Sequence, residues 1–174
     1  MISNFANANN LLLMAEVIIG VGEGTLFQSK KTSKKRESET ESKRGRFSVC
    51  VHEACHAIVA HVFGFKVYKV TVRESKNWFS GRALMEVPVC PVLDSFVTLA
   101  GSAGEVLWQT RKSGEVSVDD WKEMRRRRIS GIGMALVIPQ LNKLLKKNKK
   151  VIYRVAKALN KKGTLLRKEF LELL

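Results

Sequence analysis

The chain has 174 residues, enough for one domain with its own hydrophobic core, and a second full domain would be crowded. Its 31 Lys and Arg against 16 Asp and Glu give a net charge of +15, which favours contact with nucleic acid, an anionic membrane or an acidic protein. The chain contains no Gly-Lys-Ser or Gly-Lys-Thr, so it encodes no phosphate-binding loop, and we predict no ATPase.

The first residues, 1–28, predict a short N-terminal helical segment. Their apolar run from Leu11 to Val21 is interrupted by Glu16 and is far shorter than the roughly 20 residues that a membrane span requires. No Lys or Arg precedes this run, so it lacks the basic region of a signal peptide. We therefore predict no membrane span. The three cysteines form no disulfide framework, which favours a reducing environment and a cytoplasmic location.

Residues 29–46 are almost wholly Lys, Arg, Ser, Thr and Glu, without an apolar residue. This composition predicts a basic flexible linker. The folded domain is then expected to span residues 47–174.

That domain opens on an apolar stretch that contains His52-Glu53-Ala54-Cys55-His56, an H-E-x-x-H arrangement. On an α-helix, residues four apart lie on one face, so both imidazoles can reach one metal ion. Glu53 is offset by about 100° from His52, which places its carboxylate beside the metal as a general base. The surrounding residues are mostly apolar, and two imidazoles and a carboxylate buried there need a partner. The alternative is a surface helix with two solvated histidines; the pattern favours a zinc site with Glu53 as the catalytic residue.

Two alternating segments, Lys66–Val72 and Gly81–Val87, predict strands after a break at Gly64. A turn around Pro88 and Pro91 leads into a second apolar helix, Leu93–Trp108, whose small residues permit close approach to the zinc helix. Glu105 is unusual in that apolar setting. It is a candidate for a carboxylate that orients a histidine ligand, and a charge on the helix surface is the alternative.

The residues from Cys50 to Ala60, followed by Lys69-Val70-Thr71-Val72, resemble the peptidase domain of the FtsH family of ATP-dependent zinc metalloproteases. Similarity continues in Leu99–Leu107, which resembles the second conserved helix of that family, and in Ser117–Trp121, which resembles its Asn-Asp-Leu segment. Leu165–Leu171 is similar to the family's closing helix. The resemblance covers the peptidase domain alone, and the chain is similar to small stand-alone relatives without the ATPase module. One departure is Cys55, where the family has glycine.

This resemblance implies that His52 and His56 are zinc ligands, that Glu53 is the catalytic base and that Asp120 is the third ligand. Asp119 is the reserve for that position, because adjacent helical residues diverge by about 100° and only one can point at the metal. Ser117 and Asp120 also form an S-x-x-D pattern, so a capping box is the alternative role for Asp120. If the third ligand lies elsewhere, Glu105 is the next carboxylate to test.

The C-terminal third supplies much of the charge. A helix from Ser117 is expected to continue into Arg125–Arg128, and the lysines between Lys143 and Lys150 lie around the start of the next helix. A solvated rim on a helical bundle is one interpretation of this charge. An anionic partner such as nucleic acid is the second, and homo-oligomer formation through the apolar C-terminus is the third.

We therefore predict an α+β fold, mainly α-helical, in which a zincin-like metallopeptidase domain carries a small β-sheet beside the zinc helix. The predicted function is a zinc-dependent endopeptidase that hydrolyses protein or peptide substrates through a zinc-bound water, with Zn²⁺ as cofactor. One alternative is a catalytically silent zinc-containing binding or regulatory protein. The other is a basic nucleic-acid-associated factor.

Overall fold

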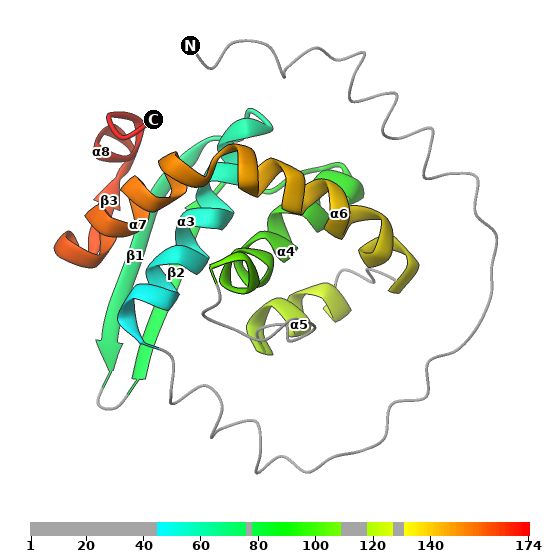
Figure 1. Cartoon of the computed structure of the whole chain (residues 1–174), viewed down its shortest axis with the longest axis horizontal. Coiled ribbons are helices and arrows are strands. Elements are labelled where there is room, and N and C mark those ends of the chain that lie inside the picture. The colour runs from blue at the N-terminus through cyan, green and yellow to red at the C-terminus, as the bar shows by residue number, and fades with distance from the viewer. Residues whose placement is uncertain (1–44, 76–77, 109–117, 127–130) are drawn as a thin grey trace.

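The computed structural model describes residues 45–75, 78–108, 118–126 and 131–174 (Figure 1). The predicted N-terminal segment and all but the last two residues of the predicted linker lie outside these residues. The described elements are α3 (Arg46–Val62), β1 (Val67–Ser75), β2 (Trp78–Met85), α4 (Pro91–Leu107), α5 (Val118–Arg126), α6 (Gly131–Lys147), α7 (Lys149–Lys162), β3 (Thr164–Leu166) and α8 (Arg167–Leu171). The fold is α+β and mainly helical, with a small three-stranded antiparallel sheet, as predicted at this level.

Helix α3 lies at the centre of the described fold. Twelve of its 17 residues are buried, because α4, α7 and the first two strands all pack against it. Its apolar residues form one core with side chains from α4, α6, α7 and β1. The helix ends at Phe63 and Gly64, where a φ of +83° suits glycine and the Gly64 N–H bonds to His61 O at 2.9 Å. A helix buried on most sides is what its nearly continuous apolar sequence predicts.

The sheet has the order β2-β1-β3, so β2 is an edge strand. Val72 pairs with Gly81 on β2, and Val70 pairs with Leu165 on β3. The register of β1 against β2 shifts between Val67 and Lys69, as in a β-bulge, and Val67, Val70 and Val72 are all buried. The predicted sheet beside α3 is therefore present. Strand β1 continues to Ser75, beyond the predicted end at Val72, and β2 begins at Trp78 rather than at Gly81.

The C-terminal third differs from the prediction in two ways. Helix α6 already begins at Gly131 and contains Pro139, so the lysines from Lys143 to Lys150 lie across its end and the start of α7. The predicted closing helix is a strand over Thr164–Leu166 followed by a five-residue helix. The physical reason is Gly163: its φ of +73° ends α7 and turns the chain, so that Leu165 can pair with β1.

In the described part of the chain, no helix combines the length and the apolar character that crossing a bilayer demands. Residues 127–128 of the predicted arginine cluster lie outside the described residues.

Candidate metal centre

Two imidazoles from α3 and one carboxylate from α5 meet at a single point. The Nε2 atoms of His52 and His56 lie 3.0 Å apart, as expected for residues one helical turn apart. Asp120 Oδ1 lies 3.4 Å from His52 Nε2 and 3.5 Å from His56 Nε2. His52 and Asp120 are buried, and His56 is nearly so. These three side chains form a group that could hold a metal ion.

Residues of helix α4 contact all three of these side chains and fix their orientation. His56 Nδ1 lies 2.6 Å from the Val97 carbonyl oxygen, which only accepts, so Nδ1 carries the proton and donates it. His52 Nδ1 lies 3.5 Å from Glu105 Oε2, and Ser102 Oγ donates to Asp120 Oδ2 at 2.5 Å. With the outer atoms engaged in this way, both Nε2 atoms and Asp120 Oδ1 point into the same small volume. This is the arrangement in which metal-binding histidines are usually held.

Glu105 is fully buried, which excludes the surface-charge alternative. Its Oε1 accepts a hydrogen bond from Ser48 Oγ at 3.0 Å, while its Oε2 faces His52. The carboxylate therefore links the first turn of α3 to the first histidine. That it orients this histidine toward a metal stays a prediction.

The charges of the centre favour a cation at its middle. Burial lowers the pKa of His52, but the Asp120 carboxylate, with help from Glu105 and Glu53, outweighs this effect and raises it to about 10. Burial raises the pKa of Asp120, but the two imidazoles hold it well below its usual range. Burial also raises the pKa of the Cys55 thiol, so that group stays neutral and is a poor metal ligand. The two histidines and Asp120 thus form a buried group whose charges favour a bound proton, and the same group could hold a metal ion.

Three glycines make room for the side chains of α3. A Cβ on Gly101 would fall within 2.5 Å of His56 Nε2 and would also overlap the His52 ring. A Cβ on Gly104, one turn later, would overlap the Cys55 sulfur, and a Cβ on Gly81 of β2 would lie 2.5 Å from Glu53 Oε1. The predicted close approach of the second apolar helix is therefore confirmed, and its glycines accommodate the histidines and Cys55.

A cleft of about 600 Å³ runs along the centre. Its lining includes His52, Glu53, His56 and Asp120, and one wall is formed by residues 79–88, most of which belong to the edge strand β2. Glu53 is only 7% exposed, and its carboxylate lies against Gly81 on that strand. The cleft thus brings together the metal group, a glutamate and the edge of a sheet.

The predicted site residues His52, Glu53, His56, Asp120 and Glu105 all gather at this centre. Asp120 bonds to Ser102 and faces the histidines; Ser117, its partner in the capping alternative, lies outside the described residues, as does the side chain of Asp119. Sequence reasoning missed the hydroxyls of Ser48 and Ser102, the Val97 carbonyl and Gly81. A serine and a backbone carbonyl carry no pattern of their own, because what they bond to depends on which helix packs beside them.

No protein-family model matches this chain, and no curated protein matches it.

Proposed function

We propose that the protein is a zinc-dependent endopeptidase similar to the peptidase domain of the FtsH family. The observation that carries this proposal is the meeting of His52, His56 and Asp120 in one cleft with Glu53. The sequence motif alone predicted that the two histidines share one face of a helix. The carboxylate of Asp120, which comes from α5, supports the third ligand that the resemblance implies.

The donor set fits zinc. Zinc binds histidine nitrogen and carboxylate oxygen at 2.0–2.2 Å in tetrahedral geometry, so neighbouring ligand atoms should be roughly 3.3 Å apart. The three separations in the centre are 3.0, 3.4 and 3.5 Å. Catalytic zinc sites use three protein ligands and keep a fourth position open, whereas structural sites use four. Three ligands facing a cleft match the catalytic class.

Glu53 is the residue to which we assign the proton transfers. It lies next to His52 on α3 and in the cleft, so it can accept a proton from an attacking water and donate one to the leaving amine. A bound zinc ion supplies Lewis-acid chemistry, in that it polarises a peptide carbonyl and lowers the pKa of water from 15.7 to about 7. His52, His56 and Asp120 would hold the ion, and the contacts from Val97, Glu105 and Ser102 would keep these ligands in place.

The edge strand β2 offers a binding mode for the substrate. An extended peptide can add to a sheet edge through main-chain hydrogen bonds, which recognise any sequence in extended form. Because β2 forms the wall of the cleft against which Glu53 lies, a peptide on this edge would pass over the metal group. Only a backbone that is already extended can pair with this edge, so we expect the protein to cut segments that are flexible or unfolded.

The decisive experiment compares Glu53→Gln with Glu74→Gln. The first keeps the ligands and the side-chain size but removes the proton acceptor; the second removes the same charge from an exposed position on β1, outside the cleft. We expect all three proteins to bind one zinc by elemental analysis. Wild type and Glu74→Gln should cleave an unfolded protein substrate, and Glu53→Gln should do so several orders of magnitude more slowly.

Each alternative has its own result in this experiment. Zinc bound by a wild-type protein that cleaves nothing would favour the catalytically silent zinc protein. A wild-type protein that takes up no metal would contradict the metal centre itself and favour a nucleic-acid-associated factor. Unchanged cleavage by Glu53→Gln would refute the role of Glu53 and leave the metal ligands standing.

A further inference from the structure

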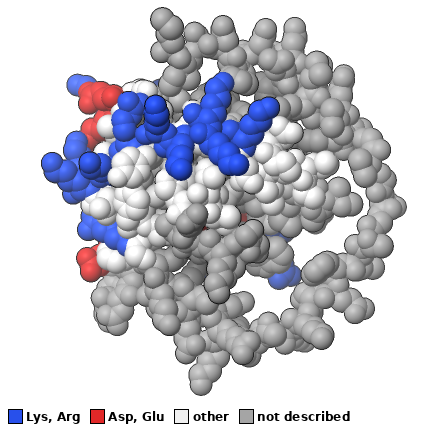
Figure 2. Space-filling view, viewed as in Figure 1, with Lys and Arg blue, Asp and Glu red and all other residues white. Residues whose placement is uncertain are grey.

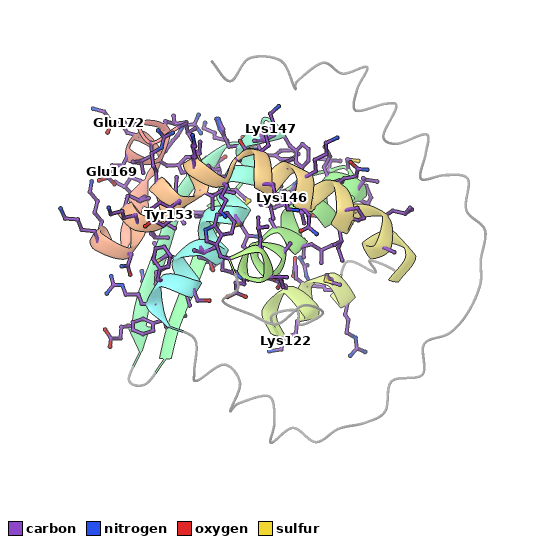
Figure 3. All side chains as sticks on the ribbon, viewed as in Figure 1. Lys122, Lys146, Lys147, Tyr153, Glu169 and Glu172 are labelled. Carbon is purple, nitrogen blue, oxygen red and sulfur yellow. The ribbon has the colours of Figure 1, made fainter. Side chains whose placement is uncertain are left out.

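Residues 131–168 carry a strongly biased charge that the proposed peptidase does not use. They contain eleven Lys and Arg and no Asp or Glu. Figure 2 shows Lys and Arg side chains gathered on one face of the molecule, over α6 and α7. The acidic residues that follow, Glu169 and Glu172, lie beyond α7 near the C-terminus (Figure 3).

The basic side chains are arranged in a row. Helices α6 and α7 follow one another end to end with Asn148 between them (Figure 1). A subset of their exposed cations recurs at intervals of four, four, three and four residues, which places them on one side of a rod about 23 Å long. We call this row the basic ridge; it consists of Lys146, Lys150, Arg154, Lys157 and Lys161. Neighbouring members are spaced by one helical turn.

The opposite face of α7 is already occupied by the protein core. Its apolar residues Ile152, Val155, Ala156 and Leu159 are fully buried against the domain. A membrane-surface helix buries its apolar face in the bilayer, and α7 cannot do so because its apolar face is already packed against the protein. Within the described stretch 143–162, Tyr153 is the one large apolar side chain that is exposed, at 48%. The ridge thus offers charge with little apolar surface, whereas specific protein interfaces have an apolar core.

We infer that the basic ridge binds the phosphate backbone of a nucleic acid. A polymer of uniform negative charge needs no more than a row of cations, and Lys and Arg contacts to phosphate dominate such binding. Tyr153, labelled in Figure 3, lies one helical turn from Lys150 and from Lys157 on α7, and its ring can stack on an unpaired base. This inference stands independently of the proposed peptidase activity.

The ridge and the metal centre lie on different sides of α3. Cys50 points from α3 toward α7, where its sulfur lies 3.9 Å from Asn160 Oδ1. Cys50 and His52 are two positions apart on α3. Side chains two positions apart on a helix point about 200° away from each other, so His52 faces away from α7. A nucleic acid on the ridge therefore leaves the cleft open. We expect both sites to be occupied at once.

The test uses two triple alanine variants of the full chain. In the ridge variant, Lys150, Lys157 and Lys161 are replaced; in the control, Lys66, Arg73 and Arg125 are replaced. All six side chains are exposed, and each variant loses three positive charges, so the net charge is matched. Binding to a fluorescein-labelled 20-base-pair DNA duplex of mixed sequence is measured by anisotropy between 50 and 200 mM NaCl.

We expect the ridge variant to lose at least tenfold in affinity at 50 mM NaCl. Its slope of log affinity against log salt should become less steep by about 2.7, since each phosphate contact contributes about 0.9. The control should keep both the affinity and the slope of wild type, and all three proteins should keep their zinc content. Equal losses in both variants would show a general charge effect, and no loss in the ridge variant would place binding elsewhere on the chain; either result overturns the inference.

A membrane partner is tested with the same proteins. Vesicles in which one third of the lipid is phosphatidylserine replace the duplex, and binding is measured by co-sedimentation. Ridge-dependent binding to vesicles without ridge-dependent binding to DNA or to an RNA of the same length would overturn the inference. Binding to nucleic acid through the ridge, with any vesicle binding weaker, supports it.

Discussion

Replacing Gly101 with alanine is a sensitive test of the metal centre, because it adds a single methyl group directly against the Nε2 atoms of both histidines. The new Cβ would lie 2.5 Å from His56 Nε2, and an ordinary contact begins at 3.4 Å, so the ring has to move by about 0.9 Å. Metal–ligand distances tolerate errors of about 0.2 Å. The required movement is therefore more than four times what the coordination allows, and we expect Gly101→Ala to weaken zinc binding at least a hundredfold.

Gly104→Ala is the matched control. It adds the same methyl group one turn later on α4, where the overlap is with the sulfur of Cys55 rather than with a ligand. In both variants the helix gains about 1 kcal/mol from the Gly-to-Ala exchange, and crowding costs about 1–3 kcal/mol. We expect both proteins to fold with similarly lowered stability. Gly104→Ala, however, should keep zinc within about tenfold of the wild-type affinity.

The assay is a zinc titration against a chromophoric chelator, with thermal unfolding of each metal-depleted protein measured in parallel. The stability data separate loss of the fold from loss of the site. Wild-type zinc affinity in a folded Gly101→Ala protein would refute the placement of the histidines against α4. Loss of zinc in both variants with no loss of stability would show that the centre depends on α4 in a way unrelated to steric contact.

Three further predictions concern the remaining groups of the centre. Asp120→Ala should reduce zinc content after dialysis against a weak chelator at least tenfold, whereas Asp119→Ala should keep the metal; the reverse pattern would place the ligand one residue earlier. Glu105→Gln keeps the size of the side chain but removes the charge that faces His52, and should weaken zinc binding about 10- to 100-fold in the same titration; an unchanged affinity would limit Glu105 to a packing role. Because the pKa of His52 is raised to about 10 from its usual 6.5, its ring carries a proton at neutral pH that zinc must displace. The zinc association constant should therefore rise about tenfold per pH unit between pH 7 and 8.5 and level off above pH 10, and a flat profile above pH 7 would contradict the raised pKa.

The parts of the fold that could be predicted are those whose pattern repeats along the chain. The apolar residues around the H-E-x-x-H arrangement predicted a buried helix, and α3 begins at Arg46, one residue before the expected start. Alternation predicted β1 and β2, whereas their position beside α3 was an expectation from the resemblance, which the contacts of α3 with both strands confirm. Strand β3 was missed because three residues are too few to show a period, and because its pairing with β1 exists only once Gly163 has turned the chain. Helix α6 was missed in part because Pro139 disfavours the interior of a helix.

The sequence by itself determined the relation of His52, Glu53 and His56, because the period of the helix alone places two of these side chains on one face and the third beside them. It also determined the charge of the ridge, since no acidic residue occurs anywhere in 131–168. The tertiary structure decided which groups complete the centre. Asp120 and Glu105 reach the histidines, and Ser102 reaches Asp120, because glycines at 101 and 104 let α4 pack closely on α3 while α5 packs on α4. Such contacts join residues far apart in the chain, so their distances follow from packing and have no counterpart in local periodicity.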